Sequence, residues 1–340
     1  MTDGSPGTEA HKAGEICFRG VSKQYPGREG AAVKDLSFEV PAGEICVLIG
    51  PSGCGKTTAL KLVNRLIPMT EGDITIDGRS VNDHEVTELR RGIGYVFQEI
   101  GLFPHMTIEE NIGSVPRLLG WKKERIRGRA SELLELVGLD PKGDLKRYPG
   151  EFSGGQQQRI GVARAMAVDP PIMLMDEPFG AIDPITRDRL QNDFLRLQSE
   201  IKKTIVFVTH DIDEAIKMGD RIAIMREGQL VQLDTSDKLL ASPSDDFVAS
   251  FVGADRGLKR LRLWTLRDLD LEPGSGGSGP SVPIDSSLRD ALSLMLTDGS
   301  RELEVTGDDG SIAGRVKLDQ IIGYVGPEGE ATAQDEVARA

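Results

Sequence analysis

The segment from Gly50 to Thr58 constrains the fold of this chain more than any other. It reads Gly50-Pro51-Ser52-Gly53-Cys54-Gly55-Lys56-Thr57-Thr58, a G-x-x-x-x-G-K-T pattern that follows the apolar run from Ile45 to Ile49. Because glycines lack side chains, successive backbone N–H groups of such a loop can point at phosphate oxygens, and the next helix offers its positive end to the same anion. Lys56 would reach β- and γ-phosphates, and Thr57 would place its hydroxyl on Mg²⁺. The alternative is a glycine-rich turn with a surface lysine, which requires the same residues to fall in register by chance.

The composition excludes several classes of protein. The chain has 340 residues, of which 39% are apolar, enough for one large domain and a smaller one. Its net charge of −13 disfavours nucleic acid as a partner, because binding to a phosphate backbone depends on Lys and Arg. No window approaches the ~18 consecutive apolar residues of a membrane-spanning helix, and residues 1–15 lack the apolar core of a secretory signal. We therefore expect a cytosolic chain whose cysteines, Cys17, Cys46 and Cys54, are reduced thiols.

A second candidate anion site lies about a hundred residues after the first. Phe152 is followed by Ser153-Gly154-Gly155-Gln156, and the residues from Ile160 to Ala167 are helical in composition. Ser153 is a natural helix N-cap, so the simplest interpretation is a capped helix start. A sharper interpretation is a second anion site, since a hydroxyl, glycine N–H groups and the helix dipole converge there.

Charged side chains follow two apolar strands. The run Ile172 to Met175 ends in Asp176-Glu177, and the run Thr204 to Thr209 ends at His210. In open α/β sheets, ligands bind at the carboxyl ends of the parallel strands. Carboxylates at that edge require a cation or a chemical role to offset the loss of solvation. We therefore expect Asp176, Glu177 and His210 at a functional edge of the sheet.

Together these motifs resemble those of the ABC-transporter ATPases, over roughly residues 16 to 252. The order that carries the resemblance is Tyr25, the phosphate loop, Gln98, the Ser153-Gly154-Gly155-Gln156 signature, Asp176-Glu177, Asp183 and His210. Phe152 stands where leucine is commonest in the signature. The resemblance implies a P-loop NTPase of ABC type, with a mixed α/β sheet core, that hydrolyses ATP with Mg²⁺.

The resemblance also implies a role for each site residue. Tyr25 would stack on adenine, while Lys56, Thr57 and the rest of the loop would hold the phosphates and Mg²⁺. Gln98 would sense the metal and the attacking water, and Asp176 would support the metal. Glu177 would polarise the water and His210 would contact the γ-phosphate. Positioning and neutralisation of charge dominate such phosphoryl transfer.

The same family implies partners. One chain carries one phosphate loop and one signature, so the working unit would be a homodimer with two ATP molecules at its interface. Transmembrane permease subunits would place it peripherally at the cytoplasmic face of the plasma (inner) membrane, and an extracytoplasmic solute-binding protein would act indirectly. The stretch Gln98 to Thr107 resembles importers of glycine betaine, choline, carnitine and proline. The alternatives are an amino-acid importer and a soluble ABC ATPase acting on DNA or ribosomes, although neither a long coiled-coil insert nor tandem nucleotide domains are visible.

The domain limits follow from shifts in composition. We expect a flexible tail at 1–15, an ABC ATPase domain at 16–253 with a helical insert at about 100–165, and a disordered tail at 327–340. Residues 254–326 read as a β-α-β-β-α unit after the Gly- and Ser-rich loop 272–280. This unit resembles a single regulatory CBS motif, with a plain α+β appendage as the alternative. The basic run Arg256, Lys259, Arg260 and Arg262 is interpreted as a solvated linker rather than a sensor of ionic strength.

Overall fold

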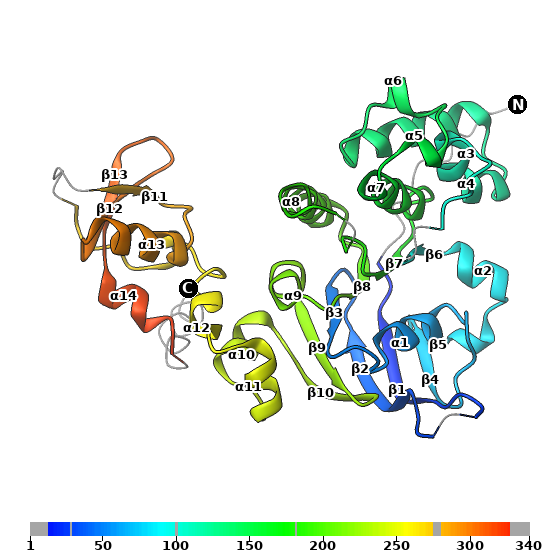
Figure 1. The fold of residues 1–340 in the computed structure, drawn as a ribbon, viewed down its shortest axis with the longest axis horizontal. Coiled ribbons are helices and arrows are strands. Elements are labelled where there is room, and N and C mark those ends of the chain that lie inside the picture. Colours follow the sequence, from blue (N-terminus) through cyan, green and yellow to red (C-terminus); the bar gives the residue numbers. More distant parts are fainter. Residues whose placement is uncertain (1–12, 28, 99–100, 181, 275–279, 327–340) are drawn as a thin grey trace, which may run out of the picture. The chain divides into compact units, whose positions relative to one another are not determined.

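The structure, a computed structural model, divides the chain into two compact units, residues 1–233 and 234–340 (Figure 1). It describes residues 13–27, 29–98, 101–180, 182–274 and 280–326. Most of the predicted tail at 1–15, all of the predicted tail at 327–340 and the centre of the predicted flexible loop therefore lie outside the described residues. The division after Leu233 precedes the expected domain limit at 253.

The first unit contains two sheets. The first sheet has the strand order β2-β1-β4-β5 and the second has the order β10-β9-β3-β8-β7-β6. The strands are β1 (Ile16–Lys23), β2 (Val33–Val40), β3 (Ile45–Ile49), β4 (Glu71–Ile76), β5 (Arg79–Ser80), β6 (Ile93–Val96), β7 (Ile172–Asp176), β8 (Thr204–Val208), β9 (Arg221–Arg226) and β10 (Gln229–Asp234). The pairs in the first sheet are antiparallel, whereas β6, β7, β8, β3 and β9 pair in parallel. These are the mixed α/β sheets expected from the sequence.

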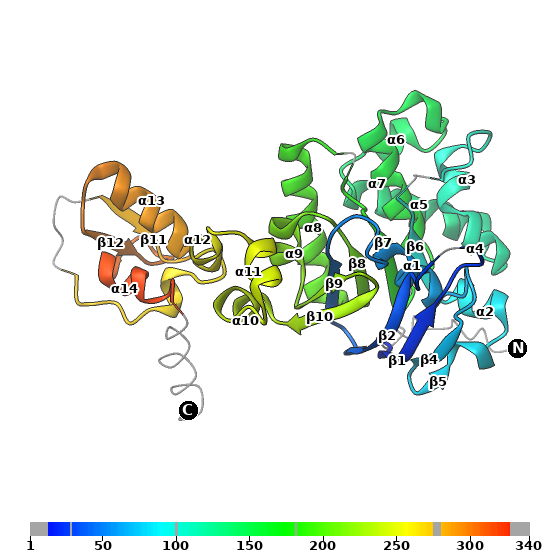
Figure 2. The same ribbon diagram turned by 60° about the horizontal axis from the view of Figure 1, so that its bottom comes forward.

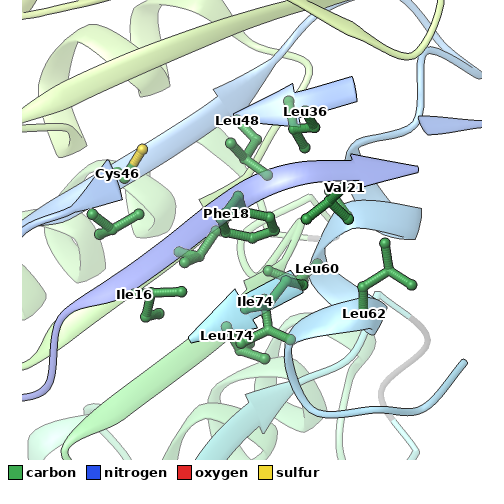
Figure 3. Close-up of a cluster of buried hydrophobic side chains, with 14 of the residues drawn as sticks. Ile16, Phe18, Val21, Leu36, Cys46, Leu48, Leu60, Leu62, Ile74 and Leu174 are labelled. Carbon is green, nitrogen blue, oxygen red and sulfur yellow. The ribbon is translucent and has the colours of Figure 1, made fainter. Parts of the chain in front are cut away.

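The burial of each strand explains its pattern of apolar and polar residues. Every residue of β3, β7 and β8 is buried, which is why these strands read as continuous apolar runs ending in a few functional side chains. In β2, apolar and polar residues largely alternate because one face is exposed. The side chains between the two sheets form one core with helix α1 (Figure 3), in which Phe18, Leu60 and Leu174 are each at most 1% exposed.

Helices surround the second sheet and form a separate group at its β6 end (Figures 1 and 2). The helices of the first unit are α1 (Lys56–Val63), α2 (Val86–Arg91), α3 (Ile108–Ile112), α4 (Ser114–Leu118), α5 (Lys123–Leu136), α6 (Pro141–Asp144), α7 (Gly154–Ala165), α8 (Pro184–Ile201) and α9 (Ile212–Met218). Helix α7 packs on α3, α5 and strand β6, so it joins the group to the sheet.

The second unit contains a small sheet in the order β11-β12-β13, whose inner side chains form a core with two helices. Its elements are α10 (Ser236–Ala241), α11 (Asp246–Val252), α12 (Arg256–Arg260), β11 (Ser281–Pro283), α13 (Leu288–Asp298), β12 (Glu302–Thr306), β13 (Ile312–Lys317) and α14 (Leu318–Gly323). Strands β11 and β12 are parallel, and β12 and β13 are antiparallel. The elements from β11 to α14 follow the expected β-α-β-β-α order.

The interpretation of residues 256–262 as a solvated linker is wrong. Residues Arg256–Arg260 form α12, in which Arg260 is 0% exposed. Its Nε donates to Asp237 Oδ1 at 2.6 Å and its Nη2 donates to Asp237 Oδ2 at 3.0 Å, and the indole N–H of Trp264 donates to the same carboxylate at 3.1 Å. A bidentate carboxylate satisfies the planar guanidinium, so the charge can be buried.

No helix within the described ranges is both long enough and apolar enough to cross a membrane. The three cysteines are free thiols and all are buried. Burial raises the pKa of the Cys46 thiol to about 12, which keeps it protonated at neutral pH.

Candidate functional site

The candidate site is an open cavity of about 820 Å³ beside the loop between β3 and α1. It brings together most of the residues predicted from the sequence. Its lining residues are Tyr25, Pro26, Ala32, Ser52, Gly53, Gly55, Lys56, Thr57, Thr58, Gln98, Glu177 and His210. Because β6, β7, β8 and β3 are neighbouring parallel strands, the segments that follow them meet at one edge.

Two glycines give the phosphate loop its shape. Gly50 has φ +151° and Gly55 has φ +103°, backbone conformations that are strained for any residue with a side chain. A Cβ on Gly50 would lie 2.1 Å from the carbonyl oxygen of Met225, and a Cβ on Gly55 would lie 2.2 Å from that of Ala32. The loop therefore passes so close to neighbouring backbone that glycine is required at both positions. Gly53, with φ +80°, has no atom within 4 Å of its would-be Cβ.

Lys56 closes the loop on itself. Its Nζ donates to the carbonyl oxygens of Gly50 at 2.7 Å and Pro51 at 3.1 Å, and it lies 3.7 Å from Cys54 Sγ. The residue is only 7% exposed. The ammonium group is thus held at the loop, where its positive charge adds to that of the helix N-terminus.

Helix α1 begins without a side-chain cap. Its N-cap is Gly55 in the left-handed conformation, and no side-chain hydrogen bond caps it. The N–H groups of a first helical turn lack partners within the helix, so this start can receive an anion. Cys54 is 4% exposed, so its small side chain is buried within the loop.

The Thr57 hydroxyl and the Asp176 carboxylate meet at the edge of the cavity. Thr57 Oγ1 donates to Asp176 Oδ1 at 2.9 Å, and Asp176, the last residue of β7, is 3% exposed. Burial raises the pKa of Asp176, and the hydrogen bond from Thr57 opposes that rise. Across the part of the chain that the structure describes, no group of three or more His, Cys, Asp or Glu forms a metal cage.

Gln98, Glu177 and His210 form a cluster at the ends of β6, β7 and β8. Gln98 Nε2 donates to Glu177 Oε2 at 3.3 Å, and His210 Nδ1 lies 3.3 Å from Glu177 Oε1. Glu177 has the unusual φ of +48°, and its N–H donates to the carbonyl oxygen of Val208 at 2.9 Å. Its side chain is 23% exposed, so the carboxylate is sheltered yet reaches the cavity.

Tyr25 is half-buried and also lines the cavity. The Nζ of Lys23 lies 5.1 Å from the centre of its ring, within the range of a cation–π contact. Stacking of this ring on adenine stays a prediction.

The signature residues are absent from the lining of the cavity. Ser153 is exposed and begins α7, where its Oγ accepts from the Gln156 N–H at 3.3 Å and the Gln156 side chain accepts from the Ser153 N–H at 2.9 Å. This reciprocal pair is a capping box. The guanidinium of Arg147 lies 4.2 Å from the ring centre of Phe152, a contact that leucine at that position would not make. Asp183 likewise caps α8 by accepting from Thr186 N–H at 3.0 Å.

Sequence reasoning missed two lining residues, Pro26 and Ala32. Ala32 matters because its carbonyl oxygen determines how closely Gly55 approaches β2. The small residues around it, Gly30 and Ala31, are consistent with a close approach of backbone, but no motif marks the position.

The fold and the arrangement of these side chains define an ABC-type P-loop ATPase. A family model described as "ABC transporter" matches residues 33–180. The osmoprotectant import ATP-binding protein OsmV of Salmonella typhimurium is 52% identical over 305 residues, 89% of this chain and 79% of that protein. The choline transport ATP-binding protein OpuBA of Bacillus subtilis is 47% identical over 307 residues, 90% of this chain and 79% of that protein. The chain belongs to the ABC transporter family.

Another relative, the glycine betaine uptake system ATP-binding protein YehX of Escherichia coli, is 41% identical over 90% of this chain and 99% of that protein. Among solved structures, a dimeric ATP-binding cassette in a post-hydrolysis state with ADP and Pi is similar, with a TM-score of 0.60 and 35% identity. The match covers 65% of this chain and 98% of the cassette. These findings confirm the resemblance to the ATPase subunits of osmoprotectant importers and the ATP hydrolase activity expected from it.

Proposed function

We propose that this chain is the ATP-hydrolysing subunit of an importer for quaternary-amine osmoprotectants such as glycine betaine, choline and carnitine. The observation that carries the catalytic part is the meeting of Gln98, Glu177 and His210 in the cavity that also holds Lys56 and Thr57. The names of the relatives support the class of solute.

The phosphate loop and Lys56 would bind the β- and γ-phosphates of ATP. Gly53 leaves open space within 4 Å of its would-be Cβ, and the start of α1 has no side-chain cap, so phosphate oxygens can approach the backbone N–H groups. The oxygens of Thr57 and Asp176, 2.9 Å apart, have the chemistry that Mg²⁺ prefers. When bound, Mg²⁺ supplies neutralisation of the charge on the phosphate oxygens.

The three-residue cluster would act on the attacking water. Glu177 can accept a hydrogen bond from that water and orient it, because its carboxylate is held from both sides by Gln98 and His210. His210 is 65% exposed at its side chain and can turn toward a γ-phosphate. In phosphoryl transfer this kind of positioning, rather than covalent chemistry, lowers the barrier.

The signature would complete the site of a second copy of the chain. Ser153 and Gly154 are exposed and lie outside the cavity lining, so within one chain they have no role in binding the nucleotide. The similar solved cassette is described as dimeric. A head-to-tail homodimer would place the exposed Ser153 hydroxyl opposite the phosphate loop of the partner.

A groove between the sheet and the helical group would receive a permease subunit. It has a volume of about 300 Å³ and displays Leu66, Phe97 and Phe103, which are 39%, 39% and 43% exposed. Arg90 and Arg91 also line it. Apolar side chains beside arginines fit an amphipathic segment with acidic residues, such as a cytoplasmic loop of a membrane subunit. The chain would then sit peripherally at the cytoplasmic face of the membrane, and a solute-binding protein would act on the far side.

Residues 254–326, within the second unit, would form a regulatory CBS-like domain. Its β-α-β-β-α order and its own core support this proposal. CBS motifs that bind adenosine nucleotides usually carry Ser or Thr three residues before an acid, but here Val316 precedes Asp319, and Val316 is 0% exposed. A buried apolar side chain cannot hydrogen-bond a ribose, so we do not propose a nucleotide as its ligand. The domain limits 16–253 and 254–326 belong to this proposal.

Uptake by the reconstituted transporter tests the function. The chain, co-purified with its membrane subunits and reconstituted with the solute-binding protein, should accumulate radiolabelled choline or glycine betaine in vesicles when ATP is supplied. The same preparation with Glu177→Gln is the matched control and should show no ATP-driven uptake. Uptake of histidine or glutamine in place of the quaternary amines would favour the runner-up, an amino-acid importer, and would contradict the proposed solute.

A further inference from the structure

The segment that carries His210 is anchored by hydrogen bonds on both sides of that residue. On one side, the N–H of Thr209 donates to the carbonyl oxygen of Leu48 at 3.3 Å, which joins the segment to β3, the strand that leads into the phosphate loop. On the other side, the N–H of Asp211 donates to the Thr209 hydroxyl at 3.1 Å. Thr209 is 1% exposed, whereas the His210 side chain is 65% exposed. The backbone at His210 is therefore fixed while its imidazole remains accessible.

A buried carboxylate holds the Thr209 hydroxyl. Glu214 lies in the first turn of α9, is 8% exposed and accepts a hydrogen bond from that hydroxyl. The hydroxyl thus donates to Glu214 and accepts from the Asp211 N–H at the same time. Because a hydroxyl has one hydrogen to donate, these two partners determine its orientation. The carboxylate of Glu214 therefore influences the residue before His210 and the residue after it.

This arrangement differs from an ordinary capping box. Asp211 is the N-cap of α9, and its Oδ1 accepts from the N–H groups of Asp213 at 2.9 Å and Glu214 at 3.2 Å. In a capping box, the side chain three residues after the N-cap accepts the N–H of the N-cap directly. Glu214 occupies that position here, but the Thr209 hydroxyl stands between its carboxylate and the Asp211 N–H. The helix start is thus hydrogen-bonded to the strand end that precedes His210.

A second helix fixes the carboxylate. Gln191 of α8 is 4% exposed, and its Nε2 donates to Glu214 Oε1 at 2.8 Å. Burial raises the pKa of Glu214, and the hydrogen bonds from Thr209 and Gln191 oppose that rise. A buried carboxyl group that lost one of these donors would be left with an unsatisfied oxygen, which is costly. Contacts with α8, α9 and β3 therefore hold Thr209 in one position.

We propose that Thr209 and Glu214 are positioning residues for ATP hydrolysis, which act through His210 by holding the backbone on both sides of it. This inference rests on the proposed function, because it requires His210 to contact the γ-phosphate. His210 Nδ1 lies 3.3 Å from Glu177 Oε1, so a shift of the backbone at His210 would separate the two side chains. A small misplacement of a group that acts on the reacting atoms lowers the rate of the chemical step.

ATP hydrolysis by the complete transporter tests the inference. The chain is assayed with its membrane subunits in proteoliposomes, with solute-loaded binding protein and choline as the solute. Thr209→Val keeps the shape of the side chain and removes the hydroxyl. The kcat should fall about tenfold, because Glu214 and the Asp211 N–H each lose a hydrogen-bond partner. The KM for ATP should stay within about twofold, since neither Thr209 nor Glu214 lines the nucleotide cavity.

Two further variants show whether the hydroxyl and the carboxylate act as one connection. Thr209→Ser keeps the hydroxyl and should keep kcat within about twofold of the wild type. Glu214→Leu removes the acceptor and should lower kcat as Thr209→Val does. Because both changes break the same connection, the double variant should lose less than the product of the two single losses. Fully multiplicative losses, or a loss in Thr209→Ser equal to that in Thr209→Val, would overturn the proposal.

Lys217→Gln is the matched control. Lys217, also on α9, contacts the same neighbouring helix as Glu214, because its Nζ donates to Asp188 Oδ1 of α8 at 2.6 Å. This contact between α8 and α9 does not include residues 209–211, so Lys217→Gln should keep the wild-type kcat. Equal losses of kcat in Lys217→Gln and Thr209→Val would mean that only the packing of α9 on α8 matters, which would contradict the proposal.

His210→Gln separates this inference from the proposed function. Loss of turnover in His210→Gln together with wild-type kcat in Thr209→Val would contradict this inference alone. Wild-type turnover in His210→Gln would contradict the proposed role of His210, and this inference with it. Unfolding midpoints are measured for every variant. If Glu214→Leu does not fold, Glu214→Gln replaces it: this variant keeps one oxygen acceptor and should lower kcat by a smaller factor, about threefold. Wild-type kcat in that variant would also count against the proposal.

Discussion

Helices α1 and α7 of the first unit differ in how the N–H groups of their first turns are capped. Every helix begins with N–H groups that have no partner within the helix. At α1 the N-cap is Gly55 and no side chain caps it, whereas at α7 Ser153 and Gln156 cap each other. The start of α1 is thus adapted to an anion from outside the chain, while that of α7 is stable by itself and exposes Ser153. The two starts therefore differ in kind: the phosphate loop lines the cavity, whereas the signature is capped by its own side chains, and its Ser153 is exposed outside the cavity lining.

Ser153→Arg, at the start of α7, is expected to have the largest effect: it should abolish turnover but leave ATP binding at the start of α1. A long cation at the exposed signature would obstruct the partner half of a composite site, so ATP turnover should fall to the assay background. ATP binding by one subunit should persist, because Ser153 does not line the cavity. Turnover and nucleotide affinity measured on the same preparation check this. Wild-type turnover would refute the dimeric site.

Glu177→Gln leaves the starts of α1 and α7 unchanged. It removes the carboxylate that is proposed to orient the attacking water. Turnover should fall by about 10²–10⁴, the range for a lost general base, while ATP affinity is retained. Glutamine keeps an acceptor and the length of the side chain, so the change tests charge rather than packing. Single-turnover hydrolysis with a separate binding titration is the measurement. If this variant hydrolysed ATP at the parent rate, Glu177 would lose its role.

Replacing the glycine at each helix start by alanine should have opposite effects on stability. In Gly55→Ala the new Cβ would lie 2.2 Å from the Ala32 carbonyl oxygen at φ +103°, so we expect a loss of stability of several kcal/mol, about 1–2 kcal/mol of it from backbone strain alone, together with loss of ATP binding. In Gly154→Ala nothing lies within 4 Å of the new Cβ. The unfolding midpoint in urea should stay the same or rise, since alanine favours helix. Equal destabilisation by the two variants would contradict the comparison.

The start of α9 is a third case, in which we expect a smaller effect on stability that depends on pH. Asp211 caps this helix, and burial raises the pKa of Glu214 in its first turn despite hydrogen bonds with Thr209 and Gln191. An acid whose pKa is raised on folding binds its proton more tightly in the folded state. Its contribution to stability is therefore complete below the unfolded-state pKa and is lost as pH rises through the folded-state pKa. Glu214→Gln should remove the decrease in melting temperature that this group causes as pH rises above the ordinary glutamate value of 4.5.

Glu85 provides a control of opposite sign. It caps α2, and backbone hydrogen bonds from Thr87 and Glu88 lower the pKa of its exposed carboxyl. Its contribution is present above the unfolded-state pKa and is lost as pH falls. Glu85→Gln should therefore weaken stability at neutral pH rather than restore it. The same slope in both variants would mean that burial of Glu214 does not determine its titration.

The sequence predicted the local parts of the site better than its three-dimensional contacts. The phosphate loop, the helix start at Ser153 and the polar residues at the strand ends could be located because each depends on neighbouring residues and on the edge rule for parallel sheets. The β-α-β-β-α order of the second unit followed from periodicity for the same reason.

Contacts between distant segments could not be predicted in the same way. The burial of Arg260 depends on Asp237, on a different helix, and the shape of the loop at Gly55 depends on the carbonyl oxygen of Ala32. Such contacts are set by tertiary packing, which a single sequence does not display.

The backbone of Glu177 carries an evolutionary consequence. Its φ of +48° lies in the left-handed region, where asparagine is accommodated more readily than glutamate, at a difference of order 1 kcal/mol. Under the proposed function of Glu177, selection for a more stable fold and selection for hydrolysis act in opposite directions at this one position. A duplicated copy released from the need for turnover would gain durability through a single Glu177→Asn change. ATPase domains that bind nucleotide without hydrolysing it would therefore arise easily after such a duplication.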